Sequence, residues 1–127
     1  MSELAGKATR SVLIVGGNEQ LRGVLADMAK EEGFEANTFA TGEEAVVFIH
    51  ESPENQPLAV VCFFDLGRGR MKGNQILREL IRVYPETPAV LVSVESSLGK
   101  FVEEEGFQFL SELDFHGIQG FIRGLRM

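Results

Sequence analysis

Five times along the chain, a short run of apolar residues is followed by a longer stretch in which apolar residues recur every three or four positions. A short apolar run is typical of a strand buried on both faces, and the longer period is typical of a helix with one buried side. The five runs lie at residues 11–15, 34–39, 59–64, 89–94 and 107–110. Repeated strand-helix pairs of this length predict a parallel sheet with helices on both faces. We therefore expect an α/β fold of the flavodoxin-like, doubly wound type with strand order 2-1-3-4-5.

The helices are indicated by apolar positions at helical spacing and by residues that begin or end helices. Gly33 and Gly106 follow two of these stretches, where a left-handed C-terminal cap is usual. Thr41 with Glu44 three residues later forms a capping-box pattern, and Ser97 is expected to cap the fourth helix. The positions predicted to face inward are Leu21, Val24, Leu25, Met28, Ala45, Phe48, Ile49, Ile76, Leu77, Leu80, Ile81, Tyr84, Leu98, Phe101, Val102, Ile118, Phe121, Ile122 and Leu125.

Length and charge limit the classes of function. With 127 residues, the chain is expected to form one domain, residues 11–127, preceded by an extension, residues 1–10. The net charge of −7 opposes binding to nucleic acid or to an anionic membrane, and no apolar stretch is long enough to span a membrane. Cys62 is the only cysteine, so an internal disulfide is excluded. We expect a stand-alone cytoplasmic protein that binds neither nucleic acid nor membranes.

Asp65 directly follows the most apolar of the predicted strands. In open parallel sheets of this type, ligands bind at the carboxyl ends of the strands, near the point where the strand order reverses. A carboxylate there can act as a nucleophile toward phosphorus, provided that a metal ion and a cation offset the charge that develops. The alternative is a loop aspartate that caps the following turn.

Five segments form a pattern along the chain: Ser11-Val-Leu-Ile-Val15, Phe64-Asp65-Leu66, Met71-Lys72-Gly73, Leu91-Val-Ser93 and Gly106-Phe-Gln-Phe-Leu-Ser111. In order and spacing they resemble the response-regulator receiver (CheY-like) domain, and the resemblance covers residues 11–126. It implies that Asp65 is the phospho-acceptor, phosphorylated by a histidine kinase. It also implies that Ser93 supplies the hydroxyl that turns toward the phosphate, and that Phe109 holds the aromatic position that rotates inward in response.

The sequence departs from the receiver pattern at the residues that hold Mg²⁺ and the phosphoryl group. Receivers carry two acidic residues after the first strand, where this chain has Gly16 and Gly17. The lysine after the fifth strand is replaced by Glu112, and the proline that follows it is Leu113. Mg²⁺ prefers carboxylate oxygens in octahedral geometry, so we expect no metal site and no cofactor, with Mg²⁺ entering only if Asp65 is phosphorylated.

Three residues are candidates for replacing the lost groups. Arg68 and Arg70 lie shortly after Asp65 and are candidate substitute cations, although a loop arginine is usually only a surface charge. Glu19 is a candidate for holding a metal ion through water. Losing the metal ligands and the lysine is expected to slow phosphoryl transfer by about 10³ to 10⁵.

The first hypothesis for function is a non-enzymatic, receiver-like protein of two-component signalling that acts by protein contact, with weak or absent Mg²⁺-dependent phosphorylation. Its expected partner is a histidine kinase or another signalling protein, or a second copy of the chain. The contact is expected at the fourth helix, fifth strand and fifth helix, which carry Leu98, Phe101, Phe107, Phe115 and Phe121. The second hypothesis is a genuine phospho-acceptor at Asp65 with a rebuilt pocket. The third is a small ligand or anion binder that uses the crevice at Gly16 and Gly17.

Overall fold

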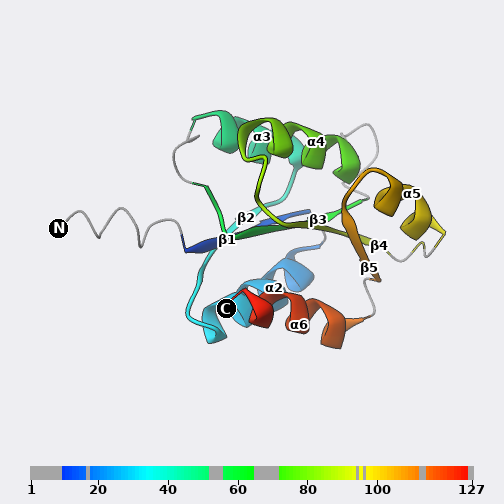
Figure 1. Ribbon diagram of the computed structural model, residues 1–127. Helices are drawn as coiled ribbons and strands as arrows, with labels where there is room; N and C mark the ends of the chain where they lie inside the picture. The colour runs from blue at the N-terminus through cyan, green and yellow to red at the C-terminus, as the bar shows by residue number, and fades with distance from the viewer. Residues whose placement is uncertain are drawn as a thin grey trace.

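The computed structural model describes residues 10–16, 18–51, 56–64, 72–93, 95, 97–111 and 114–125. Its centre is a sheet of five parallel strands in the order β2-β1-β3-β4-β5 (Figure 1). The strands are β1 (Ser11–Val15), β2 (Glu35–Phe39), β3 (Ala59–Phe63), β4 (Ala89–Ser93) and β5 (Gln108–Ser111). The predicted flavodoxin-like topology is therefore confirmed.

Five helices connect the strands and cover the sheet. They are α2 (Glu19–Glu31), α3 (Gly42–Glu51), α4 (Gly73–Val83), α5 (Leu98–Glu104) and α6 (Phe115–Gly124). Helices α3 and α4 lie on one face of the sheet and α2 and α6 on the other, while α5 lies beside the edge strand β5 (Figure 1). In the described part of the chain, no helix has the length and the apolar character that crossing a membrane requires.

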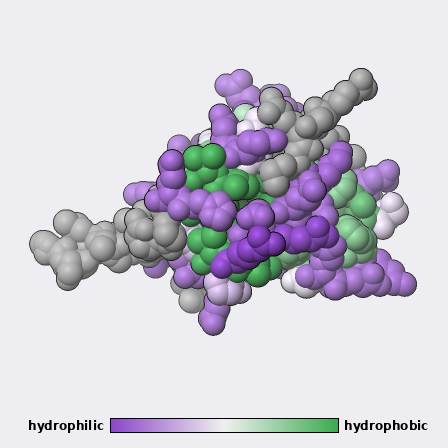
Figure 2. Space-filling model, turned by 90° about the horizontal axis from the view of Figure 1, so that it is seen from above, coloured by the Kyte–Doolittle hydropathy of each residue, from purple (hydrophilic) through white to green (hydrophobic). Residues whose placement is uncertain are grey.

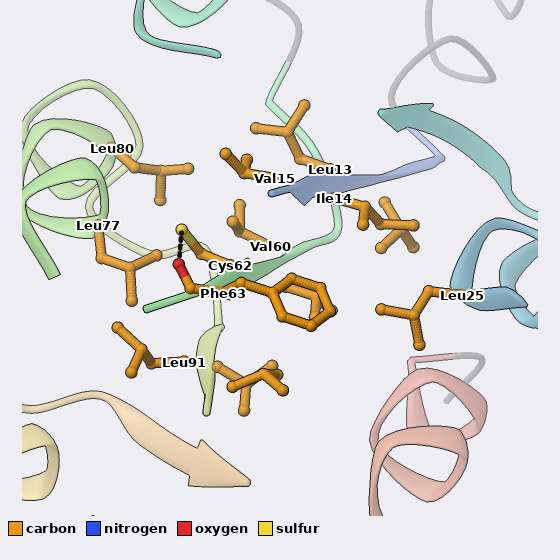
Figure 3. Close-up of a cluster of buried hydrophobic side chains, with 14 of the residues drawn as sticks. Leu13, Ile14, Val15, Leu25, Val60, Cys62, Phe63, Leu77, Leu80 and Leu91 are labelled. Atoms are coloured by element: carbon orange, nitrogen blue, oxygen red, sulfur yellow. Dashed lines mark hydrogen bonds between the residues drawn. The ribbon is translucent and has the colours of Figure 1, made fainter. Parts of the chain in front are cut away.

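The core consists of the two faces of the sheet and the inward sides of the helices. All five residues of β1 and all five of β3 are buried, as expected for strands covered on both faces. Alternate side chains of β3 point to opposite faces, so that Cys62 faces Leu77 and Leu80 of α4 whereas Phe63 faces Leu25 of α2 (Figure 3). This alternation determines which face of the sheet each side chain near the strand ends points toward.

Local signals end and begin the helices as the sequence predicts. Gly33 and Gly106 follow α2 and α5 with φ of +90° and +92°, a conformation that favours glycine. Thr41 accepts the N–H of Glu44 at 3.2 Å, which is half of the predicted capping box. Helix α6 has a cap that was not predicted: the side chain of Asp114 accepts the N–H of Gly117 at 2.8 Å.

Some predictions about burial and boundaries are wrong. Phe101 was predicted to face inward, but it is 42% exposed, because α5 lies at the edge of the sheet and only Val102 is buried. Val24 and Ile81 are also exposed, and small side chains of α2 are buried instead of Val24. Ser97 precedes α5 but its side chain makes no capping hydrogen bond. The first strand has the predicted bounds, whereas the bounds of the other four strands differ from the prediction by one residue.

Apolar side chains also reach the surface over α3 and α4. Figure 2 looks onto this face and shows apolar areas among hydrophilic side chains. Val47 of α3 is 55% exposed. The two helices are joined by a contact between His50 and Glu79, with 3.3 Å between Nε2 and Oε1. His50 and His116 are both exposed.

Candidate functional site

Backbone hydrogen bonds bring three segments together at the carboxyl ends of β3 and β4. The N–H of Phe64, the residue after β3, donates to the carbonyl of Val92 in β4 at 2.9 Å. The carbonyl of Phe64 accepts the N–H of Gly73, the first residue of α4, also at 2.9 Å. These bonds place the start of α4 and the end of β4 on either side of Phe64.

At Gly73 the backbone of α4 lies close against the end of β3. A Cβ atom at this position would overlap the carbonyl oxygen of Phe63 and lie 2.9 Å from the Cα of Phe64. Both atoms belong to the backbone and cannot turn aside as a flexible side chain would. The glycine after Lys72 is therefore required for the helix to begin directly against the end of β3.

Lys72 is held against the same strand end. Its Nζ lies 5.7 Å from the centroid of the Phe64 ring, within the range of a cation–π contact. Its backbone N–H donates to the side chain of Gln75 at 2.7 Å, which fixes the first turn of α4. Lys72 was not predicted to have a role of its own, and its place at the strand end depends on the close contact of Gly73 with β3, which the local sequence does not indicate.

Ser93 ends β4 and lies inside the protein at 6% exposed. Its Oγ accepts the N–H of Glu95 at 3.0 Å. A serine hydroxyl that accepts one hydrogen bond still carries a hydrogen that it can donate. The predicted position of Ser93 at a strand end is confirmed, and its role stays a prediction.

Gly16 follows β1 at the same edge of the sheet. It is buried, its N–H donates to the carbonyl of Phe39 at 2.8 Å, and its φ is +87°. An L-residue at this φ is strained, so the backbone here is shaped for glycine and not for an acidic residue. Gly16 offers Mg²⁺ only a backbone carbonyl, which does not fit an ion that usually retains protein carboxylates.

Phe109 lies on β5 and is half-buried. The register pairs it with Leu91 of β4, so its ring faces the side of the sheet covered by α4. A Cβ on Gly99 of α5 would lie 3.3 Å from Cδ2 of Phe109, so the ring packs against the backbone of this glycine. Its switching role stays a prediction.

Five of the predicted site residues lie outside the described residues. They are Gly17, Asp65, Arg68, Arg70 and Glu112. Their roles stay predictions. Among the residues that the structure does describe, no three histidine, cysteine, aspartate or glutamate side chains gather in a way that would hold a metal ion.

Cys62 is buried in the central strand, and burial raises the pKa of its thiol well above the ordinary value. Its Sγ lies 3.6 Å from the carbonyl oxygen of Phe63 and 3.7 Å from that of Gly73. A neutral, buried thiol is a weak nucleophile. Cys62 therefore contributes packing.

The chain is similar in sequence to part of a response regulator and similar in fold to solved receiver domains. No family model matches the chain. Over 82 residues, or 65% of its length, the chain is 32% identical to a putative NtrX-like response regulator of Rickettsia bellii, and it spans only 16% of that protein.

Solved structures agree in fold. The receiver domain of NtrX from Brucella abortus superposes with a TM-score of 0.76 at 21% identity, covering 91% of this chain and 98% of that domain. The chemotaxis protein CheY4 of Vibrio cholerae gives 0.73 at 19% identity, covering 91% and 95%. The beryllofluoride-activated NtrC4 receiver domain, a dimer, gives 0.76 at 18%, with the same coverages of 91% and 95%.

Proposed function

We propose that the chain is a response-regulator receiver (CheY-like) domain and that it signals through protein contact with little dependence on Mg²⁺-assisted phosphorylation. The observation that supports this most is Gly16, whose buried, positive-φ backbone occupies the place where receivers carry an acidic residue. The sequence supports the same proposal at Glu112, because a negatively charged carboxylate at this position would repel a negatively charged phosphoryl group.

The contact surface that we propose consists of α5, β5 and α6. Phe101 of α5 is 42% exposed and Phe115 of α6 is 43% exposed, whereas Phe107 is buried. Exposed aromatic side chains are enriched at protein interfaces, since they bury a large area with few rotatable bonds. We propose that this face binds a signalling protein and also joins two copies of the chain. The NtrC4 receiver domain, which was solved as a dimer, supports the second contact.

Phosphorylation is tested by incubating the protein with acetyl phosphate and Mg²⁺ and measuring its intact mass over time. The wild type should gain a phosphoryl group at least about 10³-fold more slowly than the Gly17→Asp/Glu112→Lys variant, which restores an acidic residue and the lysine. Rapid, stoichiometric labelling of the wild type that Asp65→Asn abolishes would contradict the proposal and establish a genuine phospho-acceptor.

The contact surface is tested separately by sedimentation velocity. Phe101→Ser should weaken self-association, whereas Val47→Ser, which removes an exposed apolar side chain from α3, should leave it unchanged. Equal weakening by both variants, or a wild type that stays monomeric at high concentration, would exclude a dimer through this face.

A thermal-shift screen against nucleotides and anions addresses the ligand-binding alternative at Gly16 and Gly17.

A further inference from the structure

We propose that the ion pair between Arg78 of α4 and Glu105, the residue after α5, tethers α5 in the position that the contact surface requires. Without this pair, α5 opens more often, and contacts made through Phe101 become weaker. The inference deepens the proposed function, because it concerns the same surface, and only its statement about contacts rests on that function.

Helix α5 buries little of its own surface. It has seven residues, fewer than the other four described helices, and Val102 is its one buried residue. It packs on β5, the edge strand of the sheet (Figure 1), and the side chain of Ser97 forms no capping hydrogen bond at its start. A helix with so few buried contacts belongs to the parts of a protein that open most easily.

The ion pair joins this helix to a firmly packed one. Nε and Nη2 of Arg78 donate to the two carboxylate oxygens of Glu105 at 3.2 and 2.7 Å. Two parallel hydrogen bonds between a guanidinium and a carboxylate are the strong form of this interaction. Arg78 extends from a helix whose Ile76, Leu77 and Leu80 are fully buried, so the pair ties α5 to a fixed position.

Glu105 provides the polar side-chain link of α5. Over residues 97–105, all of which the structure describes, only Glu105 has a side chain that forms a hydrogen bond or an ion pair. Its side chain is 20% exposed, so surrounding atoms restrict the carboxylate in addition to Arg78. The position of α5 therefore depends on its apolar contact with β5 and on this pair.

The pair lies on the same side of α5 as Phe101. Residues four apart on a helix lie one above the other, and Phe101 precedes Glu105 by four. Glu105 keeps helical backbone angles, with φ of −87° and ψ of 0°, so this spacing holds at the helix end. A link at Glu105 thus restricts the direction in which the exposed Phe101 ring points. A surface restricted in this way loses less freedom on binding and binds more tightly.

Salt distinguishes the tether from an apolar contact. The side chain of Arg78 is 53% exposed, so dissolved ions screen its attraction to Glu105. An apolar contact has no charge to screen, and the repulsion between two copies of net charge −7 falls as salt rises. Weaker self-association on adding NaCl therefore indicates dependence on the ion pair.

Native-state hydrogen exchange, followed by NMR on dilute protein, measures the opening of α5. The N–H of Phe107 donates to the carbonyl of Val102 at 3.2 Å, and opening of α5 breaks this bond. Arg78→Gln and Glu105→Gln should each lower the protection of the Val102 and Phe107 amides about fivefold. The double variant should lower it no further, because either change alone removes the pair. The charge-reversed Arg78→Glu/Glu105→Arg protein should recover part of the protection.

The matched control is Arg82→Gln, which removes an exposed arginine of the same helix whose partner, Glu79, also lies in α4. It should leave the protection of α5 unchanged. In sedimentation velocity, Arg78→Gln and Glu105→Gln should weaken self-association about two- to fivefold. Added NaCl at about 0.5 M should weaken the wild type similarly and the two variants little, since the Debye length is then only about 4 Å.

Unchanged protection of α5 in both variants, or an equal loss in Arg82→Gln, would overturn the tether. Lower protection with an unchanged dissociation constant of the dimer would overturn its link to the contact surface. A wild type that stays monomeric would instead refute self-contact in the proposed function, and the exchange measurements would still decide whether the pair holds α5.

Discussion

The close approach of α4 to the end of β3 predicts that Gly73→Ala destabilises the protein. The new Cβ would overlap the carbonyl oxygen of Phe63 and press on the Cα of Phe64. Relief requires α4 to move away, which lengthens the hydrogen bond from the N–H of Gly73 to the carbonyl of Phe64. Overpacking costs about 1 to 3 kcal/mol and a lost buried hydrogen bond about 1 kcal/mol, so the free energy of unfolding should fall by about 2 to 4 kcal/mol.

Urea unfolding followed by far-UV circular dichroism measures this loss. The matched control is Gly23→Ala, because Gly23 lies in the middle of α2 and a Cβ there would meet nothing within 4 Å. That variant should be more stable than the wild type by about 0.5 to 1 kcal/mol, since alanine loses less conformational freedom in a helix. A Gly73→Ala protein as stable as the wild type would refute the close approach and the placement of Lys72 that depends on it.

Three further predictions concern the core, a helix cap and the buried thiol. Leu77 is fully buried, so Leu77→Ala should lower the free energy of unfolding by about 2 to 5 kcal/mol in urea; a loss below 1 kcal/mol would contradict its packing. Asp114→Ala removes the cap of α6 and should cost about 1 kcal/mol in the same assay, whereas no loss would mean that solvent satisfies the Gly117 N–H equally well. Burial raises the pKa of the Cys62 thiol, so as the pH rises above about 9 the thiol loses its proton in the unfolded chain before it does so in the folded protein. The free energy of unfolding should therefore fall progressively above that pH, by at most about 1.4 kcal/mol per pH unit. Cys62→Ala should flatten that decline, and parallel pH profiles for the two proteins would refute the assignment.

The fold could be predicted from the periodicity of the apolar residues, and the structure shows why this pattern was sufficient. The apolar run after residue 58 is buried on both faces, and only a central strand of a helix-covered parallel sheet needs such a run. Gly33 and Gly106 were predictable for the same local reason, since each must adopt a positive φ to end its helix.

Burial at the edge of the sheet could not be predicted in the same way. Phe101 and Val102 both occupy apolar helical positions, but only Val102 is buried, because α5 is short and lies beside β5 instead of covering the sheet. Periodicity identifies the apolar side of a helix but not how far neighbouring elements extend over it.

Lys72 was missed because its place depends on a tertiary contact. Nothing in the local sequence indicates that the glycine after it must touch the backbone of β3. Ser93, by contrast, could be placed from the end of an apolar run alone, as could Gly16. The ends of the strands could therefore be predicted from the sequence. The position of Lys72, which precedes α4 and lies near the end of β3, could be identified only from the structure.

The central claim is that the carboxyl edge of the sheet does not bind a divalent metal ion as phosphorylatable receivers do. Titration of Mn²⁺, a paramagnetic substitute for Mg²⁺, into isotope-labelled protein tests it most directly through line broadening of individual amides. We predict no saturable broadening at Gly16, Phe64 and Ser93 in the wild type, and a gain of such broadening in the Gly17→Asp variant. Saturable broadening of these three amides in the wild type, displaced by Mg²⁺, would contradict the account.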